Sequence, residues 1–310
     1  MKNVILTGAS GFIGRSLINN LLSKEYMIVA IVPDPENLSE FDSKKLTIVK
    51  ASYTEFDTIS DKIPIKEYSE FYYLAWSGYG KFTNDYQYQI NNIKPACDAI
   101  ILAKKVGCKR FIFASSFSEY MVAKYELKSH HEGASSNVYG SVKHATRLIA
   151  HSVAKQQNLE FLSVAFANTF GPGDYSKRST NMIIKKLLNN EDVDLTEGIY
   201  LYDWNYIDDT IKGLVLAAEK GFKDEIYYIG NSFRWPLKKI IFETKSILSS
   251  KSRINIGKFD ELYHLDYSSI DVHKLYNHTG YFAEFDFDQA IKNTSLWVKS
   301  IIGILENENN

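Results

Sequence analysis

Short apolar runs alternate with longer segments of helical periodicity over the first 170 residues of the chain. The apolar runs predict buried strands, and the periodic segments predict helices. The predicted strands are residues 3–7, 27–32, 46–50, 71–75, 110–114 and 160–166, and the predicted helices lie near 12–23, 84–106 and 138–156. The second run is apolar at every position, which indicates that both faces of the sheet are covered. This rhythm predicts an α/β fold of the Rossmann type, a doubly wound parallel sheet.

The alternation becomes looser after about residue 170. Helices are predicted near 179–189, 208–220 and 236–248, and short strands near 193–195 and 226–229. We therefore expect two regions, residues 1–170 and residues 171–310. The second is predicted to be smaller and of mixed α/β structure, with some of its chain crossing back to the first. The polar tail from Glu306 is expected to fray.

Composition excludes several classes of partner. The 310 residues carry 36 Lys and Arg against 37 Asp and Glu, so a net charge of −1 provides no global field for nucleic acid or an anionic membrane. No stretch approaches the roughly 20 apolar residues of a membrane span. The two cysteines, Cys97 and Cys108, suit free thiols in a reducing compartment. We expect a cytoplasmic protein with a small-molecule partner.

Three glycines with the spacing G-x-x-G-x-x-G lie between the first predicted strand and the first predicted helix. Gly8 permits a tight turn, Gly11 lets the backbone approach a pyrophosphate, and Gly14 allows close packing of helix and strand. The helix N-terminus adds free N–H groups and a favourable dipole. The residues predicted to bind a dinucleotide here are Gly8, Ser10, Gly11, Phe12, Ile13 and Gly14. A turn without a ligand is the alternative, but its position at the first strand–helix junction favours binding.

Selection between NAD and NADP is usually made just after the second strand. Asp34 lies there, between two prolines, and could bind the ribose hydroxyls. It could equally be a solvated turn residue. The cofactor is therefore predicted to be NADP or NAD, without a choice between them.

Tyr139 and Lys143 form a Tyr-x-x-x-Lys pair at the start of a predicted helix, which places both side chains on one face. A nearby ammonium would stabilise a tyrosinate, whose pKa in water is about 10, and so allow proton transfer at neutral pH. Upstream, a buried-looking strand ends in Ser115 and Ser116, at the edge where open α/β sheets bind ligands. Ser116 could hydrogen-bond a reacting oxygen, or it could cap a turn.

Together these segments resemble the extended short-chain dehydrogenase/reductase family, of the epimerase/dehydratase type that modifies nucleotide sugars. The resemblance implies Ser116, Tyr139 and Lys143 as catalytic residues. It also implies cofactor contacts from Leu74, Ala75, Trp76, Asn92, Ala114, Ser115, Tyr139 and Lys143, and substrate contacts from Ser116, Phe117, Asn168, Met182 and Tyr206. Residues 1–170 would then bind the dinucleotide and residues 171–310 the substrate. The family resemblance further implies polysaccharide biosynthesis and a homodimer that pairs through the Tyr-x-x-x-Lys helix and its neighbour.

The departures from the family pattern bear on the reaction. Dehydratases of the family typically carry Thr-Asp-Glu where this chain has Ser116, Phe117 and Ser118, so dehydration is disfavoured. Family members often carry arginines at the positions of Ala165 and Tyr202, so diphosphate binding must differ here.

Three functions remain from this reading of the sequence. The first is an NAD(P)H-dependent reductase of a 4-keto-6-deoxy nucleotide sugar, with hydride transfer at C4. The runner-up is a nucleotide-sugar 4-epimerase. The alternative of another class is a catalytically silent dinucleotide-binding redox sensor. His130 and His131 have no further ligand spacing, so we predict no metal site.

Overall fold

The computed structural model describes residues 2–64, 66–127, 137–231, 234–260, 267 and 270–306. His130, His131 and residues 307–310 of the predicted tail lie outside the described residues. Within the described part of the chain, no helix is long and apolar enough to cross a membrane.

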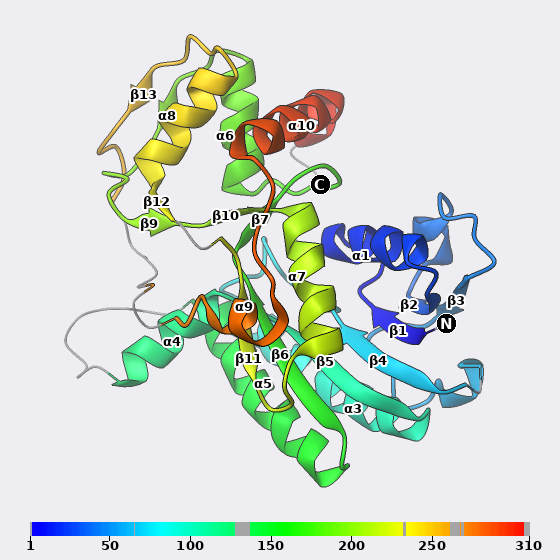
Figure 1. The fold of residues 1–310 in the computed structure, drawn as a ribbon. Coiled ribbons are helices and arrows are strands. Elements are labelled where there is room, and N and C mark those ends of the chain that lie inside the picture. The colour runs from blue at the N-terminus through cyan, green and yellow to red at the C-terminus, as the bar shows by residue number, and fades with distance from the viewer. Residues whose placement is uncertain are drawn as a thin grey trace.

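A seven-stranded, entirely parallel sheet forms the centre of the molecule (Figure 1). Its order is β11-β6-β5-β4-β1-β2-β3. The strands are β1 (Asn3–Thr7), β2 (Met27–Val32), β3 (Leu46–Lys50), β4 (Tyr68–Tyr73), β5 (Cys108–Ser116), β6 (Glu160–Phe166) and β11 (Ile226–Ile229). The strand order reverses between β1 and β4, and such a switch point in an open α/β sheet is where ligands bind. The predicted doubly wound parallel fold is confirmed.

Helices cover both faces of this sheet. Val4 and Leu6 of β1 pack on one face with α1 (Phe12–Ser23) and α7 (Ile207–Lys220). Ile5 of the same strand belongs to the opposite face, which α3 (Ile93–Lys105) and α5 (Val138–Gln156) cover. Alternate residues of a strand point to opposite faces, so a strand covered on both sides must be apolar throughout. This is the physical reason for the continuous apolar runs.

A smaller lobe lies beyond the carboxyl edge of the sheet, at the top of Figure 1. Its helices are α6 (Ser179–Leu188), α8 (Leu237–Ile247) and α10 (Phe287–Ser300), which pack on one another. Three two-stranded pairs accompany them: β7 (Asn168–Phe170) with β10 (Trp204–Tyr206), β9 (Leu201–Tyr202) with β12 (Trp235–Pro236), and β8 (Val193–Asp194) with β13 (Ile254–Asn255). The remaining helices are α2 (Tyr86–Gln89), α4 (Ser118–Leu127), α9 (Lys274–Thr279) and α11 (Ile302–Glu306), and short 3₁₀ turns are η1 (Pro35–Leu38), η2 (Ser60–Lys62) and η3 (Ile90–Asn92).

Three differences from the sequence prediction change how the chain is organised. The strand at 226–229, expected in the smaller region, is β11 of the central sheet, where it pairs with β6. The helix expected over 84–106 is divided into α2, η3 and α3. Helix α4 was not predicted, because its hydrophobic and polar residues show almost no helical segregation. After residue 170 the chain therefore returns to the sheet through α7, β11 and α9.

Candidate active site

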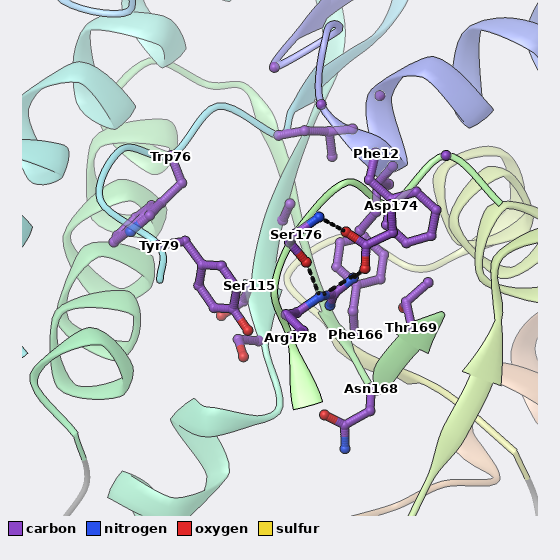
Figure 2. Close-up of a pocket in the computed structure, with 18 of the residues that line it drawn as sticks. Phe12, Trp76, Tyr79, Ser115, Phe166, Asn168, Thr169, Asp174, Ser176 and Arg178 are labelled. Carbon is purple, nitrogen blue, oxygen red and sulfur yellow. Dashed lines mark hydrogen bonds and ion pairs between the residues drawn. The ribbon is translucent and has the colours of Figure 1, made fainter. Parts of the chain in front are cut away.

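One cavity of about 470 Å³ opens at the carboxyl edge of the sheet, between the sheet and the smaller lobe (Figure 2). The segments that follow β1, β4, β5 and β6 line it, together with the start of α5 and the loop before α6. Of the predicted site residues, it contains Gly8, Ser10, Gly11, Phe12, Ile13, Gly14, Leu74, Trp76, Ala114, Ser115, Ser116, Phe117, Tyr139, Lys143 and Asn168. Residues far apart in the sequence thus meet in a single site.

The glycine turn, residues 8–14, forms one end of this cavity, which we call the glycine-turn end. Gly8 has φ +68°, and a Cβ there would lie 2.7 Å from the backbone N of Ala75. A Cβ on Gly14 would lie 2.2 Å from the carbonyl oxygen of Gly8, so these two glycines are required by packing. A Cβ on Gly11 would meet only the Gly8 oxygen, at 3.4 Å. Gly11 therefore keeps open a space above the α1 N-terminus, whose N-cap makes no side-chain hydrogen bond.

The opposite end, which we call the catalytic end, brings together Ser116, Tyr139 and Lys143. Ser116 is the last residue of β5, and Tyr139 and Lys143 lie on successive turns at the start of α5. The Ser116 hydroxyl lies close enough to the Tyr139 phenol to lower its pKa, and it donates a hydrogen bond to the Ser118 hydroxyl at 3.2 Å. The α5 N-terminus is fixed by Asn137, whose side chain accepts a hydrogen bond from the Gly140 N–H at 2.7 Å. A strand end and a helix start thus bring the two hydroxyls to the same end of the cavity.

Lys143 is buried, with only 4% of its surface exposed. Its Nζ donates a hydrogen bond to the Ala114 carbonyl at 2.8 Å and lies 3.8 Å from the centroid of the Trp76 ring. Burial lowers the pKa of Lys143 to about 7, and the charge of Glu119 partly opposes this shift. The amine therefore titrates near neutral pH.

Burial raises the pKa of Tyr139 well above its ordinary value. The nearby Ser116 hydroxyl and the positive charge of Arg178 act in the opposite direction. Lys143 points its ammonium at Ala114 and Trp76, and its Nζ lies 5.9 Å from the Tyr139 ring centroid. The expectation that Lys143 lowers the Tyr139 pKa stays a prediction.

Five predicted site residues lie outside the cavity lining: Asp34, Ala75, Asn92, Met182 and Tyr206. The Asp34 carboxylate accepts a hydrogen bond from the Glu36 N–H and begins η1, as a turn residue does. Asn92 is buried and bonds both backbone groups of Ser77, at 2.8 Å and 3.1 Å. It braces the loop after β4.

Of the other three, Ala75 lies beside the glycine turn, whereas Met182 and Tyr206 belong to the smaller lobe. Ala75 N lies 3.4 Å from the Thr7 hydroxyl, beside the glycine turn. Met182 is half-buried on α6. Tyr206 is buried, and its ring packs 4.1 Å from that of Phe285, between centroids.

Sequence reasoning missed the loop that joins β7 to α6. It contributes Asp174, Tyr175, Ser176 and Arg178 to the lining, and Tyr79 adds a ring from the loop after β4. Figure 2 shows the Arg178 side chain between Tyr79 and the Asp174 carboxylate. The spacing of four between Asp174 and Arg178 was the available signal, but such pairs usually lie on a solvated surface.

Glu119 is the carboxylate nearest in sequence to Ser116, and it is already engaged. It is 2% exposed, and its Oε2 accepts from Arg147 Nε at 2.6 Å. Glu119 does not belong to the cavity lining, whose acidic side chain is Asp174, paired with Arg178. Among the described residues, no group of three or more His, Cys, Asp or Glu side chains is arranged to hold a metal ion.

Two curated relatives align with most of the chain. The CDP-abequose synthase of Salmonella muenchen is 23% identical, over 94% of this chain and 96% of the relative. The dTDP-4-dehydro-6-deoxyglucose reductase of Escherichia coli is 24% identical, over 82% and 84% respectively.

Solved structures share the fold. The enzyme WbmF of Bordetella bronchiseptica in complex with NADH aligns with a TM-score of 0.79 and 18% identity, over 98% of this chain and 94% of that one. The UDP-glucuronic acid 4-epimerase of Bacillus cereus in complex with UDP-glucuronic acid and NAD gives 0.77 and 20%, over 96% and 99%. At such identities these structures show the fold alone. The model of the NAD dependent epimerase/dehydratase family matches residues 4–230, and the chain therefore belongs to this family of enzymes.

Proposed function

We propose that this protein is an NAD(P)H-dependent reductase of a 4-keto-6-deoxy nucleotide sugar, a step suited to polysaccharide biosynthesis. One observation carries the proposal: Ser116, Tyr139 and Lys143 share a single cavity with a glycine turn that has room for a dinucleotide pyrophosphate. The two relatives named above support it, since one is called a reductase of a 4-dehydro-6-deoxy sugar nucleotide and the other the synthase of a CDP-linked sugar.

In the proposed reaction the nicotinamide supplies hydride for C4 of the sugar. Ser116 donates a hydrogen bond to the carbonyl oxygen at C4 and so stabilises the negative charge that develops there. Tyr139, which lines the same cavity as Ser116, gives that oxygen its phenolic proton. A protonated Lys143 would stabilise the tyrosinate that remains, and it would bind the nicotinamide ribose.

The acid–base groups at the catalytic end also bear on the alternatives to a reductase, which are a dehydratase, a 4-epimerase and a silent sensor. Dehydration needs a carboxyl pair, whereas Ser118 stands next to Ser116 and Glu119 is held by Arg147. A 4-epimerase would need no further acidic group, so it remains the alternative that experiment must exclude. A silent sensor would have no use for a serine hydroxyl and a Tyr-x-x-x-Lys pair gathered in the dinucleotide cavity.

The proposed binding regions follow from the same geometry. Residues 1–170 would hold the dinucleotide through the glycine turn, Leu74, Trp76, Ala114 and Ser115. Residues 171–310 would hold much of the nucleotide sugar, with Phe117 and Asn168 at the boundary. Ala75 and Asn92 would act through the backbone they support, and Met182 and Tyr206 would shape the smaller lobe.

The proposal includes a homodimer in the cytoplasm. Ile101 of α3 and Leu148 and Ile149 of α5 are 43–48% exposed on two helices that pack side by side (Figure 1). An apolar surface of this kind suits a second copy of the chain. Both cysteines are free, as a reducing compartment requires. Leu148→Glu is expected to give a monomer in sedimentation experiments.

The test is a paired assay with a panel of 4-keto-6-deoxy nucleotide sugars and with UDP-, GDP-, CDP- and dTDP-hexoses. NADH and NADPH absorbance are followed in the first panel, and products are analysed without added cofactor in the second. The proposal predicts consumption of one cofactor per product. Interconversion of hexose epimers without net consumption would establish the 4-epimerase instead. Dinucleotide binding without turnover in either panel would favour the sensor.

A further inference from the structure

Arg178 extends into the main cavity from the loop before α6, and hydrogen bonds hold one edge of its guanidinium. Its Nη2 and Nε lie 2.6 Å and 3.1 Å from Asp174 Oδ2, and Nε also lies 3.1 Å from the Ser176 hydroxyl. Asp174 itself is only 4% exposed. A buried carboxylate therefore orients the guanidinium, which has five N–H donors and keeps others for a ligand.

The other side of the guanidinium faces the catalytic end. Tyr79 lies close enough to Arg178 to raise the pKa of the guanidinium, and the Tyr79 ring packs edge-on against Tyr139 with 5.3 Å between centroids. Its Cζ lies 5.7 Å from the ring centroid of Phe12 in the glycine turn. Figure 2 shows the Arg178 side chain between Tyr79 and Asp174. Arg178 thus lines the cavity beside both the Tyr79–Tyr139 ring pair and Phe12.

The other cationic side chains of the cavity lining, Arg15 and Lys143, already have partners. Arg15 lies at the glycine-turn end, where it forms an ion pair with Glu40 and donates to the Ser10 carbonyl at 3.0 Å. Lys143 is directed at the Ala114 carbonyl. Among the described lining residues, Arg178 is therefore the guanidinium available to an anionic group near Tyr139.

The positions at which family members often carry arginines cannot supply this charge. Ala165 is completely buried in β6. Tyr202, on β9, lines a separate and much smaller cavity together with Trp204 and Trp235. A diphosphate between a nucleoside and a sugar is strongly anionic, and a guanidinium matches its oxygens with two parallel hydrogen bonds.

We propose that Arg178 binds the diphosphate of the nucleotide sugar and takes over the role of the arginines missing at positions 165 and 202. This inference rests on the proposed function, because it takes the substrate to carry a diphosphate. Asp174 and Ser176 are positioning residues that hold the fork in place. The contact with Tyr79 couples the anchored diphosphate to the ring that packs on Tyr139.

Arg234 is the competing candidate. Its Nε and Nη1 are buried and have no hydrogen-bond partner among the described residues, and its Cζ lies 5.0 Å from the Tyr267 ring centroid. However, it does not line the main cavity, and its charge acts on the buried carboxylate of Asp203. The observations favour Arg178, and the test below includes a variant of Arg234 to decide between the two arginines.

The test measures binding, so that it does not depend on turnover. UDP, CDP, GDP and dTDP, and the four nucleosides, are titrated by calorimetry into wild type, Arg178→Met, Arg178→Lys and Arg234→Met. Arg178→Met is expected to weaken the preferred nucleoside diphosphate on the order of 10- to 100-fold, as for lost hydrogen bonds to a charged group, and to leave its nucleoside unchanged. Arg178→Lys keeps the positive charge but lacks the paired N–H donors of arginine. Its affinity for the nucleoside diphosphate is expected to lie between those of wild type and Arg178→Met.

Two further variants control for stability and for general loss of charge. Asp174→Asn combined with Arg178→Met removes the unpaired buried carboxylate and is expected to bind like Arg178→Met. Arg15→Met removes a guanidinium from the other end of the cavity and is expected to leave nucleoside diphosphate affinity unchanged. Dinucleotide affinity is measured throughout and should remain intact in both Arg178 variants.

The inference is overturned if Arg178→Met retains nucleoside diphosphate affinity, if Arg234→Met alone loses it, or if Arg15→Met loses as much. Loss of dinucleotide affinity in Arg178→Met would instead assign this arginine to the cofactor. If wild type binds none of the four nucleoside diphosphates, the substrate class fails and the inference fails with it. These outcomes separate a wrong residue from a wrong function.

Discussion

The two ends of the main cavity differ in whether backbone or side chains set their shape. At the glycine-turn end, the shape is set by backbone, with Gly8 and Gly14 leaving no room for a side chain. At the catalytic end, it is set by the side chains of Ser116, Tyr139, Lys143 and Arg178. A backbone site recognises what all dinucleotides share, whereas a side-chain site can be changed residue by residue. The difference teaches that cofactor binding and reaction type can be broken separately.

The largest effects are expected from the glycine turn, where two substitutions should fail for different reasons. Gly14→Val forces a Cβ to within 2.2 Å of the Gly8 oxygen, so the backbone must move and the folded state should lose at least the ~1–3 kcal/mol that overpacking typically costs. Gly11→Val meets only one atom, at 3.4 Å, and should fold with a nearly normal Tm but bind no dinucleotide. Thermal unfolding and dinucleotide titration of both variants check this. A Gly11→Val protein with normal dinucleotide affinity would remove the glycine turn from the cofactor site.

Tyr139→Phe should affect the catalytic end alone. Removal of a general acid typically lowers kcat by about 10²- to 10⁴-fold, and dinucleotide affinity should change little. Tyr86→Phe is the matched control, since this hydroxyl lies on exposed α2, outside the cavity. Steady-state kinetics with the preferred sugar nucleotide provide the measurement. Near-normal kcat in Tyr139→Phe would mean that another group transfers the proton.

Lys143→Met tests the catalytic end through the pH dependence of the stability of the folded protein. Burial lowers the pKa of Lys143 from its ordinary value of 10.5 to about 7. Between these values the unfolded chain binds a proton that the folded chain does not, so wild type gains stability as pH rises through this window and gains none below it. Methionine does not titrate. Its Tm relative to wild type should therefore be highest at pH 7 and below, and fall as pH approaches 10.

Thermal unfolding of both proteins across pH 6–10 measures this difference. A Tm difference independent of pH would mean that the amine keeps its ordinary pKa in the folded protein. Loss of the hydrogen bond to Ala114 lowers the variant's stability at every pH, so the slope, rather than the sign at one pH, is the test.

The smallest effect is expected at Asp34. Its carboxylate caps η1, and asparagine caps a turn equally well, so Asp34→Asn should leave both Tm and the ratio of NADH to NADPH affinity nearly unchanged. Titration of both dinucleotides checks this. A shift of tenfold or more towards NADPH would assign Asp34 to the ribose hydroxyls and make it a determinant of cofactor choice.

The sequence predicted the glycine-turn end, and the common location of the three residues proposed as catalytic, better than it predicted the smaller lobe. Strands of the sheet are covered on both faces, so their apolar runs stand out, and Gly8, Gly11 and Gly14 have a fixed spacing. Part of residues 171–310 was expected to cross back to the first region, but the sequence did not identify β11 as the crossing segment, because a run of four residues does not indicate which sheet it joins. Arg178 was missed since nothing in its local pattern distinguishes it from a surface arginine. Its orientation depends on Asp174, and its place in the cavity beside Tyr79 follows only from the fold.

The most direct test of the account follows one labelled hydride. Wild-type protein is given the reduced cofactor carrying deuterium at C4 of the nicotinamide, together with the preferred 4-keto-6-deoxy nucleotide sugar, and the product is analysed by mass spectrometry and NMR. The account predicts one deuterium at C4 of the sugar for each cofactor oxidised. Release of an epimerised sugar with no net oxidation of the cofactor would contradict it.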